Sequence, residues 1–311
     1  MLGGMLLAAP DLFGADYSAK IDVHKGERWG GVSVVGGRTM PFDKPFPKVN
    51  LAEWSQGQTT PFLVSSRGRY IWSVEPFTIE YTGDSFLITS TQEEVKAVTG
   101  GRTLREAYLV CCHKNFPPSG KTPAIDLFTR PVYDTGQELG FAPTGEGLRA
   151  YADRLLEMGY PSGTLVLAAG WQSSVGCFQP DPDLYGDFGA LIGDLHGKGF
   201  KVMLTVTPFV SGDGPVFRQY KNSNALLRMP GGRLAMAEWD GGYSAMYDLT
   251  QPETPTLLRG WLDSLGSKYG VDGYVFDCQD GVSNMRYASS GTQDYLERWT
   301  QLGEGFEYCQ Y

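Results

Sequence analysis

The feature that most constrains the fold is a regular alternation of short apolar segments and helical segments in the second half of the sequence. The apolar segments are strand-like and are residues 129–133, 164–169, 200–206 and 273–276. The helical segments have apolar residues at helical spacing or end at a glycine, and are residues 145–158, 187–198, 255–269 and 292–303. Units of this length and order predict parallel strands joined by right-handed crossovers. The sequence therefore predicts an α/β fold from about residue 128 onward.

The first part of the chain has a different pattern, with short segments of alternating polarity separated by glycine-rich turns. The predicted strands are residues 29–37, two within 61–74, 77–82, 85–89 and 104–112. The pair Gly83-Asp84 is a hairpin signal. Repeated short strands favour a β-sandwich. A Pro- and Gly-rich stretch at residues 115–123 predicts a linker, so we expect a sandwich domain over 1–127 and an α/β domain over 128–311.

The α/β part is too short for a complete barrel. An eight-stranded (β/α)8 barrel of the TIM type needs roughly 250 residues, and four strand–helix units use most of residues 128–311. The chain therefore reaches about half-way round such a barrel. Either the open sheet is complete in itself or the chain is a fragment of a longer protein. We favour a fragment, because the last strand otherwise leaves an unpaired apolar edge.

Composition excludes several classes of function. The net charge of −9, with no cluster of Lys and Arg, argues against a nucleic-acid partner. No run approaches the ~18 apolar residues of a membrane span, and the apolar N-terminal segment lacks the basic residues of a signal peptide, so we expect a cytoplasmic protein, with a secreted or periplasmic one as the alternative. The five cysteines form no Cys-x-x-Cys pair and there are three histidines, which predicts free thiols and no zinc site.

An acidic residue, Asp277, stands directly at the end of the last predicted strand, Gly273–Phe276. Parallel α/β barrels place their reactive groups at the C-terminal ends of strands. We therefore predict that Asp277 is a catalytic carboxylate; the alternative is that it caps the next helix. Asp280 follows three residues later, and we predict that it belongs to the substrate site, where it would hold Asp277 or a nearby loop in place by hydrogen bonding; the alternative is a helix cap.

Six sequence motifs, taken together and in order, resemble glycoside hydrolase family 31, the group of α-glucosidases, α-xylosidases and sulfoquinovosidases. They are PFLVSSRG at 61–68, PVYDT at 131–135, GWQ at 170–172 with GCF at 176–178, LHGKGFKVML at 195–204 with PFV at 208–210, WDGG at 239–242 with DLTQP at 248–252, and VDGYVFDCQD at 271–280. The resemblance covers most of the chain. It implies a galactose-mutarotase-like sandwich followed by the first half of a catalytic barrel, and it favours this family over an α-galactosidase-like barrel, which also has an Asp after its fourth strand.

The resemblance implies that Asp277 is the nucleophile of a retaining α-glycosidase acting on a carbohydrate without metal or cofactor. Trp171 and Trp239 are candidates for stacking on a sugar ring, with a place in the core as the alternative. Asp134 and Gln172 are candidates for binding sugar hydroxyls, and a turn-forming role is the alternative for Asp134. Asp280 could hold the nucleophile or a nearby loop in place.

The chain departs from the family pattern at three points. Ser173 stands where starch-degrading members carry an acid, and Val275 stands where many members have Trp or Lys. The family's general acid belongs to a later barrel strand than any in this chain. We therefore expect residues 1–311 alone to be inactive or nearly so, or, as the alternative, to act as a non-catalytic carbohydrate-binding member of the family.

Overall fold

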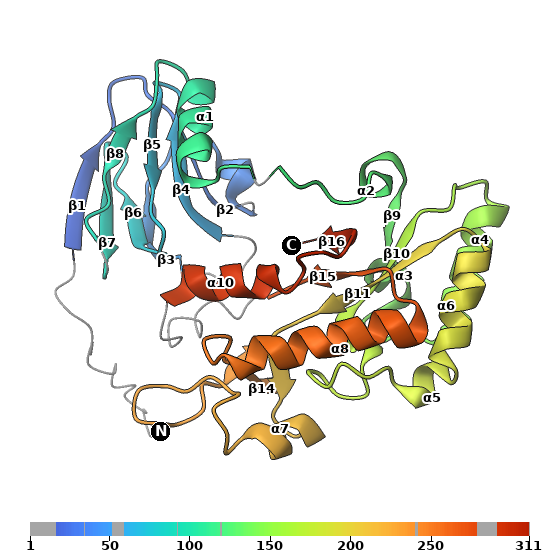
Figure 1. Ribbon diagram of the computed structural model, residues 1–311. Helices are drawn as coiled ribbons and strands as arrows, with labels where there is room; N and C mark the ends of the chain where they lie inside the picture. Colours follow the sequence, from blue (N-terminus) through green and yellow to red (C-terminus); the bar gives the residue numbers. More distant parts are fainter. Residues whose placement is uncertain are drawn as a thin grey trace, which may run out of the picture. The chain divides into compact units, whose positions relative to one another are not determined.

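The computed structural model describes residues 17–33, 35–51, 59–91, 93–118, 120–239, 242–278 and 291–310. The chain divides into two compact units, Met1–Pro118 and Ser119–Tyr311 (Figure 1). The division falls inside the Pro- and Gly-rich stretch at residues 115–123.

The first unit is a sandwich of two four-stranded antiparallel sheets. One sheet has the order β1-β7-β6-β3 and the other β2-β4-β5-β8. The strands are β1 (Tyr17–Asp22), β2 (Trp29–Ser33), β3 (Phe46–Asn50), β4 (Thr59–Ser65), β5 (Arg69–Trp72), β6 (Thr78–Tyr81), β7 (Ser85–Ser90) and β8 (Ala97–Thr99), with a 3-10 helix η1 (Val35–Thr39). Trp29 and Leu63 from one sheet share a buried core with Ile79 and Phe86 from the other. The predicted sandwich is confirmed.

One predicted strand of this unit is wrong: residues 104–112 belong to helix α1 (Leu104–Asn115). Thr103 caps the helix by accepting a hydrogen bond from the amide of Glu106 at 3.3 Å, and the Glu106 carboxylate accepts one from the amide of Thr103 at 3.2 Å. This reciprocal capping box satisfies two amides at the helix start. Ala107 and Cys111, four residues apart, are the buried face of the helix, against Tyr70. An apolar run fits a strand or a helix, and the cap decides for the helix.

The second unit is built on a five-stranded sheet with the order β16-β15-β11-β10-β9, in which all neighbouring strands are parallel. The strands are β9 (Val132–Asp134), β10 (Thr164–Leu167), β11 (Lys201–Val206), β15 (Gly273–Phe276) and β16 (Tyr308–Gln310). The long helices are α4 (Gly145–Glu157), α6 (Phe188–Gly197), α8 (Glu253–Tyr269) and α10 (Gly291–Gln301). Each strand lies beside its predecessor in this set, as in a barrel, so the described part is a half-barrel.

Strand β16 was not predicted, and it pairs with the edge of β15 that we expected to be unpaired. It pairs with β15 in the register Gly273 to Tyr308. Gly273 permits this approach, because a Cβ at that position would lie 1.7 Å from the carbonyl oxygen of Tyr308. The edge of β15 is therefore paired, and the expectation of an unpaired apolar edge there is wrong.

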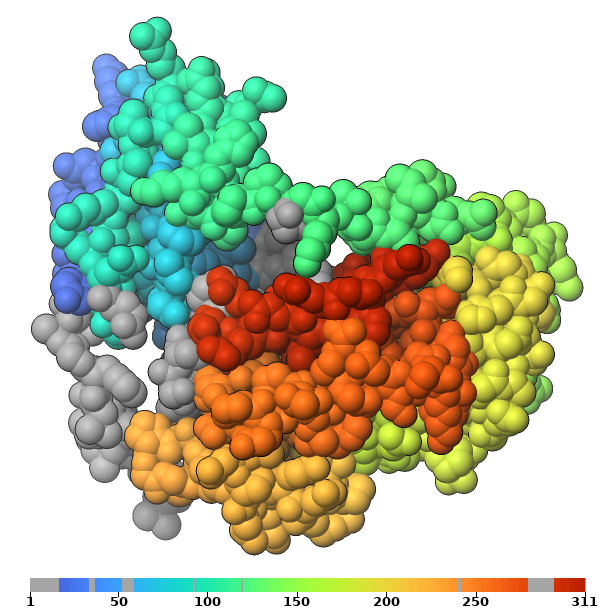
Figure 2. Space-filling model, in the orientation of Figure 1, coloured from blue at the N-terminus to red at the C-terminus, as the bar shows by residue number. Residues whose placement is uncertain are grey.

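The helices cover one face of the parallel sheet. Leu165, Leu204 and Tyr274 point to this face and share one buried core with residues of α4, α6, α8 and α10. Figure 2 shows α8 and α10 side by side at the surface, and residues of both line a common groove. The opposite face, which is the inside of a barrel, carries a smaller cluster with Val166 and Met203.

Shorter elements connect these layers. They are α2 (Asp126–Thr129), α3 (Thr135–Leu139), η2 (Ala169–Trp171), α5 (Pro182–Tyr185), β12 (Phe209–Ser211), α7 (Pro215–Tyr220), β13 (Ala237–Trp239) and β14 (Gly242–Met246). Strands β12, β14 and β13 form a small antiparallel sheet inserted between β11 and α8. Within the described ranges, no helix combines the length and apolarity needed to cross a membrane.

Candidate active site

Asp277 stands at the C-terminal end of β15, as predicted. Its main-chain amide donates to the carbonyl of Val206 at 2.9 Å, which continues the β11–β15 pairing one residue beyond the strand. Val275 packs in the cluster on the inner face of the half-barrel, and side chains alternate along a strand. Asp277, two residues later, therefore belongs to the inner face, and it is half-buried.

The residue after Asp277 is a cysteine whose thiol stays protonated. Burial, together with the negative charge of Asp277, raises the pKa of Cys278 to about 12. A protonated thiol is a poor nucleophile, since the thiolate is the reactive form. Cys278 is therefore not a candidate nucleophile, which leaves Asp277 as the candidate at this strand end. Asp280, the other predicted acid of this segment, lies outside the described residues.

Thr207 is a neighbour of Asp277 that the sequence reasoning missed. It directly follows β11, and the pairing of Val206 with Phe276 places it beside Asp277. Its hydroxyl is fully buried and has no hydrogen-bond partner in the described part of the chain. A buried polar atom without a partner is rare and calls for an explanation, such as a water or a ligand group. The sequence signal is a polar residue immediately after a buried strand.

Gln172 and Trp171 lie after β10, and both are buried. The side-chain oxygen of Gln172 accepts from the amide of Phe178 at 2.8 Å, and its amide nitrogen has no partner among the described residues. The indole nitrogen of Trp171 donates to the carbonyl of Thr205 at 2.8 Å, and the side chain is 0% exposed. Trp171 is thus a core residue here and has no open ring face for stacking.

Asp134 ends β9, the outermost strand of the sheet, and is exposed. Its Oδ1 accepts from the amide of Gly136 at 2.8 Å, which makes it the N-cap of α3. The register across the sheet relates Asp134 to β15: Asp134 pairs with Val166 of β10, and Val166 pairs with Met203 of β11. Met203 in turn pairs with Gly273 of β15. Asp134 is therefore level with the start of β15, and Asp277 is four residues further along that strand.

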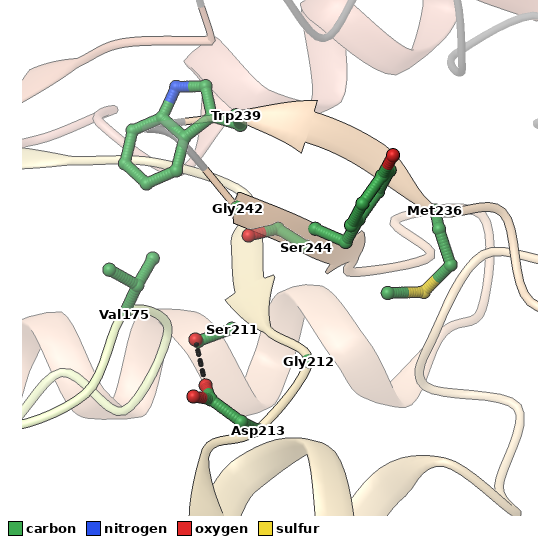
Figure 3. A pocket seen from close by; sticks show the side chains of 9 residues that line it. Val175, Ser211, Gly212, Asp213, Met236, Trp239, Gly242 and Ser244 are labelled. Carbon is green, nitrogen blue, oxygen red and sulfur yellow. Dashed lines mark hydrogen bonds between the residues drawn. The ribbon is translucent and has the colours of Figure 1, made fainter.

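A pocket of about 470 Å³ lies on the small sheet that follows β11 (Figure 3). Its lining side chains are those of Val175, Ser211, Asp213, Met236, Trp239, Tyr243 and Ser244. The ring of Trp239 stacks on Phe209, with ring centres 4.8 Å apart and planes 20° apart, and remains half-buried. Of the predicted binding residues, Trp239 is the one that lines this pocket; Asp134, Trp171 and Gln172 are not in its lining.

The acid of the pocket is held in its ionised form. The hydroxyl of Ser211 donates to Asp213 Oδ1 at 2.7 Å, and this bond, with smaller help from the residue's own amide and from Arg218, lowers the pKa of Asp213. An ionised carboxylate is a strong hydrogen-bond acceptor with two oxygens. The pocket thus combines an aromatic ring, hydroxyl groups and an anionic acceptor. The described residues contain no group of three or more His, Cys, Asp or Glu side chains placed to hold a metal ion.

A family model described as "Glycosyl hydrolases family 31 TIM-barrel domain" matches residues 137–304, which is more than half of the chain. A curated relative, the myogenesis-regulating glycosidase of Mus musculus, is 25% identical over 224 residues, covering 70% of this chain and 31% of the relative.

Solved structures share the fold. A dextranase of Flavobacterium johnsoniae, complexed with glucose, has a TM-score of 0.68 at 14% identity, covering 95% of this chain and 39% of that one. An α-xylosidase from a soil metagenome, complexed with xylose, has a TM-score of 0.69 at 16% identity, covering 92% and 43%. A sulfoquinovosidase from E. rectale has a TM-score of 0.63 at 14% identity, covering 92% and 48%. The chain thus spans less than half the length of each of these proteins.

Proposed function

This chain belongs to glycosyl hydrolase family 31, and from that premise we propose that the protein hydrolyses α-linked glycosides with retention of configuration, using Asp277 as the nucleophile. The observation that carries the proposal is the position of Asp277. It follows a central strand of the half-barrel at its C-terminal end and belongs to the inner face. Catalytic residues of barrel enzymes come from strand ends at this edge.

The proposed reaction has two displacements. In the first, an Asp277 oxygen forms a bond to the anomeric carbon while a partner acid gives its proton to the departing glycosidic oxygen. In the second, the partner removes a proton from water, and the water oxygen displaces Asp277 from the sugar. Two inversions at one carbon restore the starting configuration. The partner carboxyl group must lie ~5 Å from the nucleophile.

We assign no residue of 1–311 to the partner role. Five parallel strands are described, and a complete barrel of this type has eight. We therefore propose that residues 1–311 supply the nucleophile and a part of the sugar site, and that the acid/base group of the active enzyme lies outside them. The expected behaviour of residues 1–311 by themselves is sugar binding with little or no turnover.

The relatives support an α-glycoside as the substrate class. The similar structures include a dextranase with bound glucose and an α-xylosidase with bound xylose. The pocket beside Trp239 has groups suited to the same kind of ligand: an aromatic ring and hydrogen-bonding side chains. We propose a hexose or pentose α-glycoside as the substrate of this protein.

Mechanism-based trapping tests the nucleophile directly. The full-length protein is incubated with a 2-deoxy-2-fluoro-α-glycosyl fluoride, which slows the second displacement, and is digested for mass spectrometry. We expect a covalent sugar on the peptide that contains Asp277. Asp277→Asn should abolish the adduct and lower hydrolysis of an aryl α-glycoside by about 10⁴-fold or more.

A matched control is Asp263→Asn, which removes one acid from the outer helix α8, where Asp263 pairs with Arg259. This variant should keep wild-type hydrolysis and labelling. A labelled peptide elsewhere, or an Asp277→Asn protein with unchanged hydrolysis, contradicts the proposal. Binding of sugar without any labelling or turnover by the full-length protein favours the non-catalytic alternative.

A further inference from the structure

We infer that the pocket on the β12-β14-β13 sheet is a subsite for an uncharged sugar ring, and that Asp213 makes it reject glycosides that carry a negative charge. The inference rests on the proposed function and deepens it, because it names a specificity-determining residue. Asp213 was not predicted as a site residue and lies outside the motifs that carried the family resemblance.

The pocket lies at the same edge of the parallel sheet as Asp277. Val175 belongs to the loop that leaves β10 at its C-terminal end, and β12 begins three residues after the end of β11. Strands β10 and β11 are consecutive in the sheet with β15. Loops that leave the C-terminal ends of barrel strands form the substrate side of these folds.

The groups around the pocket suit a sugar. Figure 3 shows Trp239, Val175, Ser211 and Ser244 around one hollow, with Asp213 at its lower end. A sugar ring offers C–H faces that pack on aromatic rings, and hydroxyl groups that donate to carboxylates. A volume of about 470 Å³ lies within the range of small-molecule sites.

The charge of the pocket is one-sided. Asp213 is the one carboxylic acid among the described residues that line the pocket, and none of these described residues is a Lys, Arg or His. Arg218 of α7 lies nearby, but it donates to the main-chain carbonyl of Asp213 and is absent from the lining. A carboxylate or sulfonate on the ligand therefore meets a like charge without a facing cation. A like charge at contact distance in water-exposed surroundings costs about five- to tenfold in affinity.

The bond to Ser211 holds the Asp213 carboxylate in a defined orientation. Like any aspartate, Asp213 is ionised near neutral pH, and the hydroxyl that donates to it lowers its pKa further, so the repulsion extends to more acidic solutions. A sugar hydroxyl can still donate to the remaining lone pairs of Asp213. The same carboxylate therefore attracts a neutral sugar and repels an acidic one, which is how a site gains specificity against a competitor.

The test uses two sugars that differ in one group, methyl α-D-glucopyranoside and methyl α-D-glucuronide. Both are titrated by calorimetry into the Asp277→Asn form of the full-length protein, so that no turnover interferes. We expect the glucoside to bind about five- to tenfold more tightly than the glucuronide at low salt. The substitution Asp213→Asn, which keeps the size of the side chain and removes its charge, is then combined with Asp277→Asn. In this double variant the ratio of the two affinities, glucoside to glucuronide, should fall to about one to two.

Two further variants serve as controls, because each should keep the discrimination between the two sugars. Ser211→Ala removes the hydrogen bond but leaves the charge, so discrimination against the glucuronide should persist. Asp183→Asn removes one exposed acid on α5, outside the pocket lining, and should leave the ratio unchanged.

The outcomes separate this inference from the proposed function. Equal binding of both sugars, no binding of either, or a ratio that Asp213→Asn does not change overturns the inference even if trapping labels Asp277. A ratio that depends on Asp213 supports it even if trapping fails, in which case the catalytic proposal falls alone.

Discussion

The Nε2 atom of His196 lies 2.7 Å from Oδ2 of Asp272, and the two residues are 76 positions apart in the sequence. The same carboxylate also accepts from Nζ of Lys201 and from the main-chain amide of Val202, both at 2.8 Å. This network ties α6 and the start of β11 to the residue just before β15. It lies at the N-terminal edge of the sheet, opposite to Asp277, where the side chains of barrel folds serve stability rather than catalysis.

Breaking this network should destabilise the second unit without changing the C-terminal edge of the sheet, where Asp277 lies. Asp272→Ala leaves Lys201, His196 and an amide without their acceptor. We expect a loss of about 2–3 kcal/mol in the free energy of unfolding, measured by urea denaturation. The control Asp263→Ala removes an exposed ion pair with Arg259 and should cost less than about 0.5 kcal/mol. Equal effects of the two variants contradict this assignment.

The first unit should lose stability in acid through Glu27. Burial alone raises the pKa of this carboxyl group, but hydrogen bonds from Arg69, the amide of His24 and the hydroxyl of Ser65 outweigh it and lower the pKa from 4.5 to about 2. The Nε of Arg69 donates to Glu27 at 2.9 Å, and the Glu27 side chain is 0% exposed. Because the folded pKa is the lower one, the stabilisation is complete above about pH 4.5 and disappears as the pH falls toward 2.

A comparison of wild type with Glu27→Gln isolates this contribution from other carboxyl groups. The variant cannot ionise at this position, so it should be less stable than wild type at pH 6. Between pH 6 and pH 3, the difference in the free energy of unfolding between wild type and Glu27→Gln should shrink by about 2 kcal/mol. The measurement is urea unfolding at each pH, and a difference that stays constant with pH shows that Glu27 does not titrate as described.

Two buried threonines should respond in opposite directions to the same substitution. Thr207→Val removes a hydroxyl that has no hydrogen-bond partner in the described part of the chain. The free energy of unfolding should therefore rise by about 1 kcal/mol. Thr135→Val removes a hydroxyl that donates to the carbonyl of Val166 at 3.0 Å, so stability should fall by about 1 kcal/mol. Thermal unfolding of both variants against wild type tests this, and a loss in Thr207→Val means that its hydroxyl has a partner such as bound water.

Gly273→Ala tests the pairing of β15 with β16. The added methyl group would meet the main chain of Tyr308, which cannot move as a flexible side chain does. We expect β16 to leave the sheet, with faster hydrogen exchange at Tyr308–Gln310 and unchanged exchange in β10. Gly193→Ala on α6 is the matched control, since a Cβ there meets nothing within 4 Å. Retained protection in β16 after Gly273→Ala argues against this register.

Local signals in the sequence determined the larger part of the fold. The strand Gly273–Phe276 has the predicted bounds, and α4, α6 and α8 lie where apolar spacing and terminal glycines placed them. These elements follow from periodicity, because each must bury one face against its neighbours. The same holds for Asp277: an acid at the end of an apolar strand that follows a helix already predicts a group at the reactive edge of a parallel sheet.

Tertiary structure decided the points that depend on partners distant in the chain. The run at 104–112 is a helix with a local signal, the capping box of Thr103 and Glu106, and tertiary structure added the packing of its buried face, Ala107 and Cys111, against Tyr70. Strand β16 is three residues long and exists through its pairing with β15. Trp171 and Trp239 are alike in the sequence, yet one is fully buried and the other lines a pocket. Burial depends on which surfaces meet, and a single segment of sequence carries no record of the surface that it will face.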